Sequence, residues 1–185
     1  MTSEPPGGAT VWFTGLPSAG KSTIAAALAA RLRAARSPRP VVLLDGDDLR
    51  RTLCADLGFG RADREENVRR IGGLARAAAR DGALVLVPVI APYAVSRARV
   101  RRRHDRIGVP FLEVYIATPV EVCAWRDVKG LYARQAAGEI SGLTGIDDPY
   151  DVPTAPELRI TTEHESVAAS ADAVWRLLVS RGLAV

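Results

Sequence analysis

The chain has 185 residues, of which 48% are hydrophobic and 25% charged, so it can bury the core of one globular domain (residues 1–185) but has no room for a second catalytic domain. Its 25 basic and 21 acidic side chains leave a net charge of only +4, and its few aromatic residues argue against a base-stacking surface for nucleic acid. Cys54 and Cys123 are far apart and lack the spacing of a metal site, so we expect reduced structural thiols.

The N-terminal stretch MTSEPPGGA has neither the cationic start nor the apolar centre of a signal peptide. No apolar run approaches the roughly 18 residues that a membrane span needs. We therefore expect a cytoplasmic protein without a membrane partner.

Apolar runs alternate with helical segments along the chain. Strands are predicted at residues 10–14, 41–45, 83–89, 111–116 and 158–160. Helices are predicted to begin near residues 21, 64, 93 and 120, and a last one to span 166–181. This order predicts an α/β fold with a five-stranded parallel sheet and helices on both faces. Residues 127–156, rich in Gly, Asp and Pro, break the alternation and are predicted to form a functional lid segment.

The stretch GLPSAGKST lies between the first predicted strand and the first helix. Its spacing is that of the phosphate-binding loop (P-loop) of nucleoside triphosphatases, in which backbone amides cradle the phosphates. Lys21 is expected to reach the β and γ phosphates and Ser22 to bind Mg²⁺. The residues predicted to bind ATP here are Gly15, Leu16, Pro17, Ser18, Ala19, Gly20, Lys21, Ser22 and Thr23.

Acidic residues follow the second predicted strand in the stretch DGDDLR. Because ligands of open α/β sheets collect at the carboxyl ends of the strands, the carboxylates of Asp45, Asp47 and Asp48 can hold Mg²⁺ or accept a proton, and Arg50 can bind an acidic acceptor. A helix N-cap with acids in its first turn would also explain one of these aspartates.

Arg64 and Asn67 are three residues apart on one predicted helix face and can grip one polar ligand together, although such a pair is most often part of an ordinary charged helix. Arg126 and Lys129 flank the start of the lid segment, which suits closure over two anionic substrates. The basic stretch of residues 97–106 is interpreted as a solvated helix face. His104 and His164 are expected at the surface without roles.

Six stretches occur in an order that resembles the adenylylsulfate (APS) kinase family and together span about residues 11–157. They are GLPSAGKST, DGDDLR, GFGRADREENVRRI, APY, RDVKGLY and GEISGLTGIDDPY. That family phosphorylates the 3′-hydroxyl of adenosine 5′-phosphosulfate (APS) with ATP, which yields 3′-phosphoadenosine 5′-phosphosulfate (PAPS) and ADP in sulfate activation. The resemblance implies a P-loop kinase that uses Mg²⁺ and forms a homodimer.

The resemblance also implies roles for individual residues. Asp47 is the candidate base, and Lys21 and Lys129 assist the transferred phosphoryl group. The residues implied at the acceptor are Asp47, Arg50, Phe59, Arg64, Asn67, Ile90, Lys129 and Leu143, with Phe59 packed on the adenine. Arg126 joins the ATP site, and Ser22 and Asp45 hold the metal.

The chain departs from the family pattern at two positions. Ala91 stands where many members have a serine, which excludes a phosphoserine there, and Leu143 replaces an aromatic residue expected to stack on the adenine. The third predicted strand does not end in a carboxylate, so Asp45 or Asp47 must serve the metal. Two alternatives to an APS kinase therefore stay open: a kinase of the same fold for another anionic nucleotide or sulfated metabolite, and a nucleotide switch without catalysis.

Overall fold

The computed structural model describes residues 7–184 and contains one sheet of five parallel strands in the order β2-β3-β1-β4-β5. The strands are β1 (Ala9–Thr14), β2 (Val41–Leu43), β3 (Leu84–Pro88), β4 (Phe111–Ile116) and β5 (Leu158–Ile160). The predicted parallel sheet is therefore confirmed, with β2 and β3 shorter than the apolar runs that predicted them.

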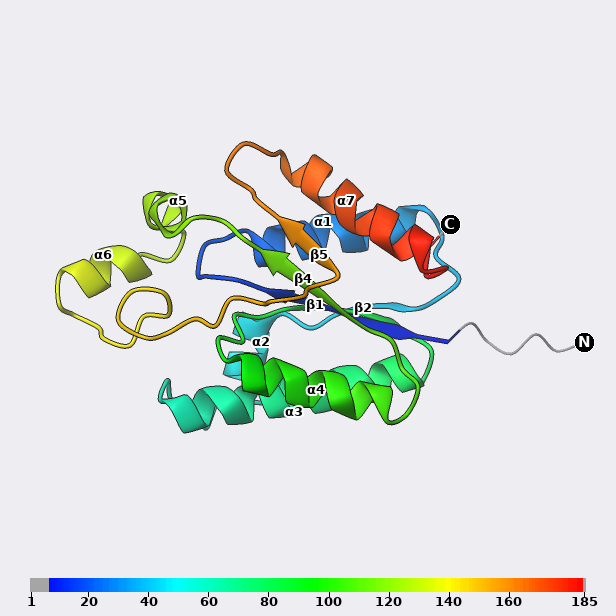
Figure 1. The fold of residues 1–185 in the computed structure, drawn as a ribbon, viewed down its shortest axis with the longest axis horizontal. Helices are drawn as coiled ribbons and strands as arrows, with labels where there is room; N and C mark the ends of the chain where they lie inside the picture. Colours follow the sequence, from blue (N-terminus) through cyan, green and yellow to red (C-terminus); the bar gives the residue numbers. More distant parts are fainter. Residues whose placement is uncertain (1–6, 185) are drawn as a thin grey trace, which may run out of the picture.

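Helices cover both faces of the sheet, as predicted. They are α1 (Lys21–Ala34), α2 (Gly46–Arg51), α3 (Arg61–Arg80), α4 (Ala94–Asp105), α5 (Val120–Arg126), α6 (Leu131–Ala136) and α7 (Val167–Ser180). Helices α1 and α7 lie on one face, and α3 and α4 lie on the other (Figure 1). Among residues 7–184, no helix combines the length and the apolar character that a membrane crossing requires.

The central strand β1 supplies both halves of the core. Val11 and Phe13 point to the cluster beneath α1 and α7, whereas Trp12 points to the cluster beneath α3. Because side chains alternate between the two faces of a strand, burial on both faces requires the unbroken apolar run from which β1 was predicted. Cys54 and Cys123 are free and buried, as predicted.

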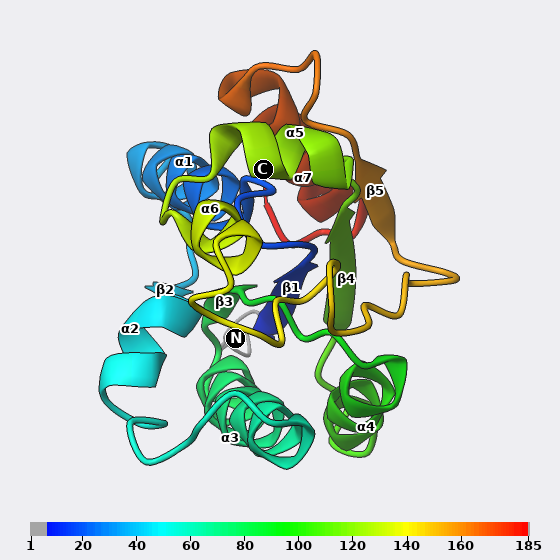
Figure 2. The ribbon, with the colours of Figure 1, turned by 90° about the vertical axis from the view of Figure 1, so that its left-hand side faces the viewer.

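All five carboxyl ends of the strands meet at one edge of the sheet, and the lid segment (residues 127–156) crosses this edge (Figure 2). The segment is more ordered than its composition predicted, because it contains helix α6. The carboxylate of Asp127 accepts the backbone N–H groups of Tyr132 and Ala133 at 3.1 and 3.0 Å and so caps this helix. A helix of six residues is too short to show an apolar period.

The interpretation of residues 97–106 as a solvated face is wrong for three of its members, Arg97, Val100 and His104. Arg97 is 3% exposed and His104 is fully buried. The His104 ring forms hydrogen bonds with Thr10 Oγ1 at 3.0 Å and with the Val100 carbonyl at 2.9 Å. Burial lowers the pKa of His104, so this ring is a neutral part of the core.

Helices α3 and α4 approach each other closely at Gly72. A Cβ atom there would lie 2.6 Å from Cγ2 of Val100, whereas a Cβ at the neighbouring Gly73 would meet nothing within 4 Å. We expect Gly72→Ala to lower the free energy of unfolding by about 1–3 kcal/mol through overpacking. Gly73→Ala should raise it by up to about 1 kcal/mol through helix propensity. Urea denaturation of both variants tests this, and an equal response would contradict the packing described here.

Candidate functional site

The P-loop follows β1 directly and leads into α1. Two of its glycines cannot be replaced without distortion: Gly15 has φ 151° and Gly20 has φ 106°. A Cβ atom at Gly15 would lie 2.5 Å from the carbonyl oxygen of Ile116, so the loop rests against the end of β4. The loop therefore keeps a compact backbone that can wrap closely around an anion.

Three hydroxyl groups form hydrogen bonds to backbone carbonyls of the P-loop. Thr118 and Thr162 donate to the carbonyl oxygen of Ala19 at 2.9 and 3.1 Å, and Tyr132 of α6 donates to that of Pro17 at 3.1 Å. Sequence reasoning missed all three. The two threonines follow β4 and β5 at the carboxyl edge, so inspection of every strand end would have found them.

Lys21 is only 9% exposed and donates to the carbonyl oxygens of Gly15 and Leu16 at 3.0 and 2.7 Å. Burial lowers its pKa to about 8, and more distant charges modify this effect. The ammonium group has no carboxylate at hydrogen-bond distance among the partners described. A phosphate group bound in the loop would supply the missing negative charge.

One cavity of about 630 Å³ lies at the carboxyl edge of the sheet and brings together most of the predicted site. The predicted residues that line it are Pro17, Ser18, Gly20, Lys21, Ser22, Thr23, Asp45, Asp47, Arg50, Phe59, Arg64, Asn67, Ile90, Arg126 and Lys129. Gly15, Leu16, Ala19 and Leu143 are not among the lining residues.

Two of the three acidic residues after β2, Asp45 and Asp47, line the cavity. Asp45 caps α2 by accepting the backbone N–H of Asp47 at 2.9 Å, so the N-cap interpretation is confirmed for this aspartate. It lines the cavity as well. Asp47 forms an ion pair with Lys129 of the lid segment, and both side chains are about half exposed. This pair joins the lid segment to α2 across the cavity.

The part of the cavity beside the P-loop, α1 and α5 is called its donor end, because the P-loop is expected to bind the phosphoryl donor there. Residues that follow β5 complete this end. Arg126 donates to the hydroxyl and the carbonyl oxygen of Thr162 at 2.7 and 2.6 Å. Glu165, Val167 and Ser170 also line this end. No sequence motif marks these three residues, which lie just before α7 and on its first turn.

The acceptor end of the cavity lies beside α2 and α3. The Arg50 guanidinium lies 4.9 Å from the centre of the Phe59 ring and donates to the carbonyl oxygens of Leu57 and Gly58. The Phe59 side chain is 72% exposed at this end, so it offers an aromatic face to a ligand. Burial lowers the pKa of Arg50, with repulsion from Arg64 a smaller cause, but a guanidinium stays charged at neutral pH.

Arg64 and Asn67 are buried on α3 and both line the cavity. Arg64 donates to the Phe59 carbonyl at 2.7 Å and to the hydroxyl of Thr144 and the Gly142 carbonyl at 2.6 Å each, so it also anchors the lid segment. The Asn67 Oδ1 atom is buried and has no hydrogen-bond partner within residues 7–184. A buried amide oxygen without a partner is costly, and a ligand that donates a hydrogen bond would satisfy it.

Leu143 lies elsewhere. It is 6% exposed and belongs to the buried cluster beneath α1 and α7. Its backbone N–H donates to the Asp147 carboxylate at 2.5 Å within a tight turn of the lid segment. The stacking role expected for position 143 therefore has no support in this arrangement, which leaves Phe59 as the aromatic side chain that lines the cavity.

A family model described as adenylylsulphate kinase matches residues 7–161. The chain belongs to the adenylylsulphate kinase family. The adenylyl-sulfate kinase of Myxococcus xanthus is 48% identical over 176 residues, which cover 95% of this chain and 94% of that protein. A structure of the Mycobacterium tuberculosis APS kinase CysC in complex with AMPPNP and APS matches with a TM-score of 0.90 at 47% identity and covers 95% of this chain and 99% of that one.

A hexameric APS kinase from Thiobacillus denitrificans also matches, with a TM-score of 0.74 at 33% identity. The match covers 98% of this chain and 30% of the Thiobacillus chain. These likenesses confirm the prediction of a P-loop kinase fold and the resemblance from which the site residues were assigned.

Because the pKa of Lys21 is lowered, nucleotide binding to this protein should be coupled to the uptake of a proton. Without ligand the lysine is half charged near pH 8, and a triphosphate should raise its pKa, so binding should take up about half a proton at pH 8 and little at pH 6.5. Affinity should fall as the pH rises through 8. Calorimetric titration with AMPPNP in two buffers of different ionisation enthalpy measures this uptake.

Lys21→Met is the control for this titration, because it retains the proton exchange of the nucleotide itself. Equal proton uptake by the wild type and by Lys21→Met would contradict the assignment of the linkage to this lysine.

Proposed function

We propose that this protein transfers the γ-phosphoryl group of ATP to the 3′-hydroxyl of APS and releases PAPS and ADP. The observation that carries the proposal is one continuous cavity, which has the P-loop at one end and Arg50, Phe59, Arg64 and Asn67 at the other. A site of this kind holds two anionic ligands beside each other. The 47% identity to an APS kinase described with AMPPNP and APS supports these two substrates.

The donor end binds the triphosphate of ATP. The amides of the P-loop and of the first turn of α1 contact the phosphates, and Lys21 leaves its two carbonyl partners for the β and γ phosphates. Arg126, held by Thr162, lies where it can cover the adenine or ribose of ATP. The roles of all residues from Gly15 to Thr23 in ATP binding are part of this proposal.

Mg²⁺ fits the donor set at this end. The exposed hydroxyl of Ser22 and the carboxylate of Asp45 both line the cavity, and hard oxygen ligands are those that Mg²⁺ prefers. Within residues 7–184 no group of three or more His, Cys, Asp or Glu side chains could hold a metal. This agrees with a cation that keeps several waters and takes phosphate oxygens as further ligands. When bound, Mg²⁺ neutralises charge on the β and γ phosphates.

The transfer forms a bond between the 3′-oxygen of APS and the γ-phosphorus and breaks the bond from that phosphorus to the bridging oxygen, which leaves with ADP. Asp47 orients the attacking hydroxyl and accepts its proton. Lys129, which pairs with Asp47 here, moves to the transferred phosphoryl group as the lid segment closes and so frees the carboxylate. Alignment and charge neutralisation supply most of the rate, because the transition state is loose.

The acceptor end recognises APS by its charge and its base. Arg50 and Arg64 bind the phosphosulfate, Phe59 stacks on the adenine, and Asn67 uses its unpartnered Oδ1 atom to accept a hydrogen bond from APS. Ile90 forms part of the wall. Because Arg64 already anchors the lid segment at Gly142 and Thr144, binding of the anion and closure of the segment depend on the same guanidinium.

A second candidate is the same transfer to another anionic nucleotide or to a sulfated metabolite. The position of Leu143 favours this possibility. Because Leu143 is buried away from the cavity, Phe59 is the one aromatic side chain of residues 7–184 that lines it, so recognition of an adenine base rests on this ring.

The homodimer and the cytoplasmic location stay predictions, and the Thiobacillus relative is described as hexameric.

An acceptor panel tests the function. Purified protein with Mg·ATP is offered APS, other anionic nucleotides and sulfated compounds without a base, and ADP release and product mass are measured. We expect ADP release that depends on APS and a product heavier by one phosphoryl group. Efficient turnover of an acceptor without a purine base would show that APS is not the specific substrate. If no acceptor were turned over, the kinase proposal would be refuted.

The base assignment predicts the effect of Asp47→Asn. It should lower kcat by about 10²-fold or more with a modest change in ATP affinity, because the carboxylate orients the hydroxyl and takes its proton. Asp48→Asn is the matched control, since Asp48 is exposed, pairs with Arg51 and does not line the cavity. If Asp45→Asn lowers kcat more and Asp47→Asn only raises the Mg²⁺ requirement, the two roles are reversed.

A further inference from the structure

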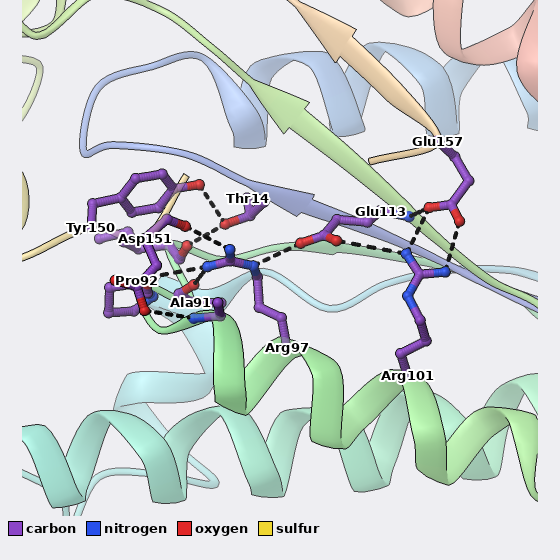
Figure 3. A network of polar contacts seen from close by, with 11 residues as sticks. Thr14, Ala91, Pro92, Arg97, Arg101, Glu113, Tyr150, Asp151 and Glu157 are labelled. Carbon is purple, nitrogen blue, oxygen red and sulfur yellow. Dashed lines mark hydrogen bonds and ion pairs between the residues drawn. The ribbon is translucent and has the colours of Figure 1, made fainter. Parts of the chain in front are cut away.

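Helix α4 carries a buried arginine that faces the cavity wall rather than solvent. The Arg97 side chain is 3% exposed and forms an ion pair with Glu113 of β4 through Nε at 2.7 Å. Arg101, one turn later on the same helix, pairs with Glu157 at 2.7 Å and lies 3.6 Å from Glu113 (Figure 3). The two arginines therefore share one acidic partner but differ in what else they contact.

Arg97 uses its remaining N–H groups on backbone carbonyls from two separate segments. Nη1 donates to the carbonyl oxygens of Ala91 and Pro92 at 2.7 and 3.1 Å, and Nη2 donates to that of Asp151 at 2.6 Å (Figure 3). The planar guanidinium thus joins the turn after β3 to the far end of the lid segment. A lysine has one nitrogen and cannot span these acceptors together with Glu113.

The turn held by Arg97 is part of the cavity. Residues 90–92 line it, next to the acceptor residues Arg64 and Asn67. Ala91 has φ 45°, a conformation that an alanine adopts only when its surroundings impose it. The contact from Arg97 to the Ala91 carbonyl is one such constraint.

The lid end is tied to the same turn by further bonds. Asp151 donates its N–H to the Pro92 carbonyl at 2.9 Å, and its carboxylate accepts the N–H of Ala94 at the start of α4. Thr14, the residue before the P-loop, donates to the Ile90 carbonyl at 2.6 Å and bonds to the Tyr150 hydroxyl at 2.9 Å (Figure 3). The cavity wall and the lid end therefore meet at Arg97.

We propose that Arg97 is a positioning residue for the acceptor: it fixes residues 90–92 and the Tyr150–Asp151 end of the lid segment so that APS meets a preformed wall. Its role depends on the guanidinium fork and not only on the charge opposite Glu113. Arg101 contributes to the fold through β4 and Glu157 but contacts neither the turn nor the lid segment. This inference rests on the function proposed above.

The test compares Arg97→Lys with Arg101→Lys, which both keep a positive charge beside Glu113 and limit the risk of unfolding. Arg97→Lys should raise the KM for APS about tenfold or more and leave the KM for ATP within about twofold, because only the acceptor wall is displaced. Arg101→Lys should leave both KM values within about twofold. Thermal unfolding of both variants records any general loss of stability.

Equal KM values for APS in the two variants, or a rise of both KM values in Arg97→Lys, would overturn the proposal. Amide hydrogen exchange supplies a readout that does not depend on the reaction. Peptides that cover residues 89–94 and 148–153 should exchange faster in Arg97→Lys than in Arg101→Lys, and unchanged exchange there would overturn the positioning role. A wild-type protein that does not use APS would instead refute the proposed function, and the exchange comparison would still decide the role of Arg97.

Discussion

The reaction proposed here must overcome the repulsion between two anions that meet at bonding distance. A net charge of +4 over 185 residues is too small to achieve this through the overall field of the protein, so the positive charge must be local. The cavity is lined by five cationic side chains, which are Lys21, Arg50, Arg64, Arg126 and Lys129. Four of these side chains form hydrogen bonds to backbone carbonyls or hydroxyls of the protein. Most of the positive charge of the cavity is therefore held in position before either substrate binds.

Placing cations in a partly buried site has costs, and the structure shows them. Burial lowers the pKa of Lys21 to about 8, and Asn67 keeps an unpartnered oxygen. Ser18, Ala91 and Asp127 have positive φ angles in the P-loop, the turn after β3 and the start of the lid segment. Backbone strain of this kind costs about 1–3 kcal/mol per residue and persists where surrounding contacts impose it. Among residues 7–184, three of the four non-glycine residues with positive φ therefore lie in or beside the cavity, whereas the fourth, Arg36, lies elsewhere.

The sequence predicted the features that depend on local spacing and failed where distant segments meet. The P-loop, the apolar strands and the acidic residues after β2 are readable because each occupies one short stretch. Arg97 was predicted to be solvated because a run of arginines is typical of an exposed helix face. Glu113, the only charged residue of the otherwise apolar strand β4, was the signal that a buried cation lies nearby. Leu143 was placed by family pattern at the adenine, whereas the tight turn of the lid segment directs it into the core.

A crystal structure of the protein with Mg²⁺, AMPPNP and APS would show whether one cavity holds both anions in line for phosphoryl transfer. We expect the γ-phosphate in contact with Lys21 and the 3′-oxygen of APS about 2.6–3.2 Å from the Asp47 carboxylate. We also expect that Lys129 has left Asp47 and that the phosphosulfate contacts Arg50 and Arg64. APS bound outside the wall formed by Phe59, Arg64 and Asn67, or a 3′-oxygen out of reach of Asp47, would contradict the proposed transfer.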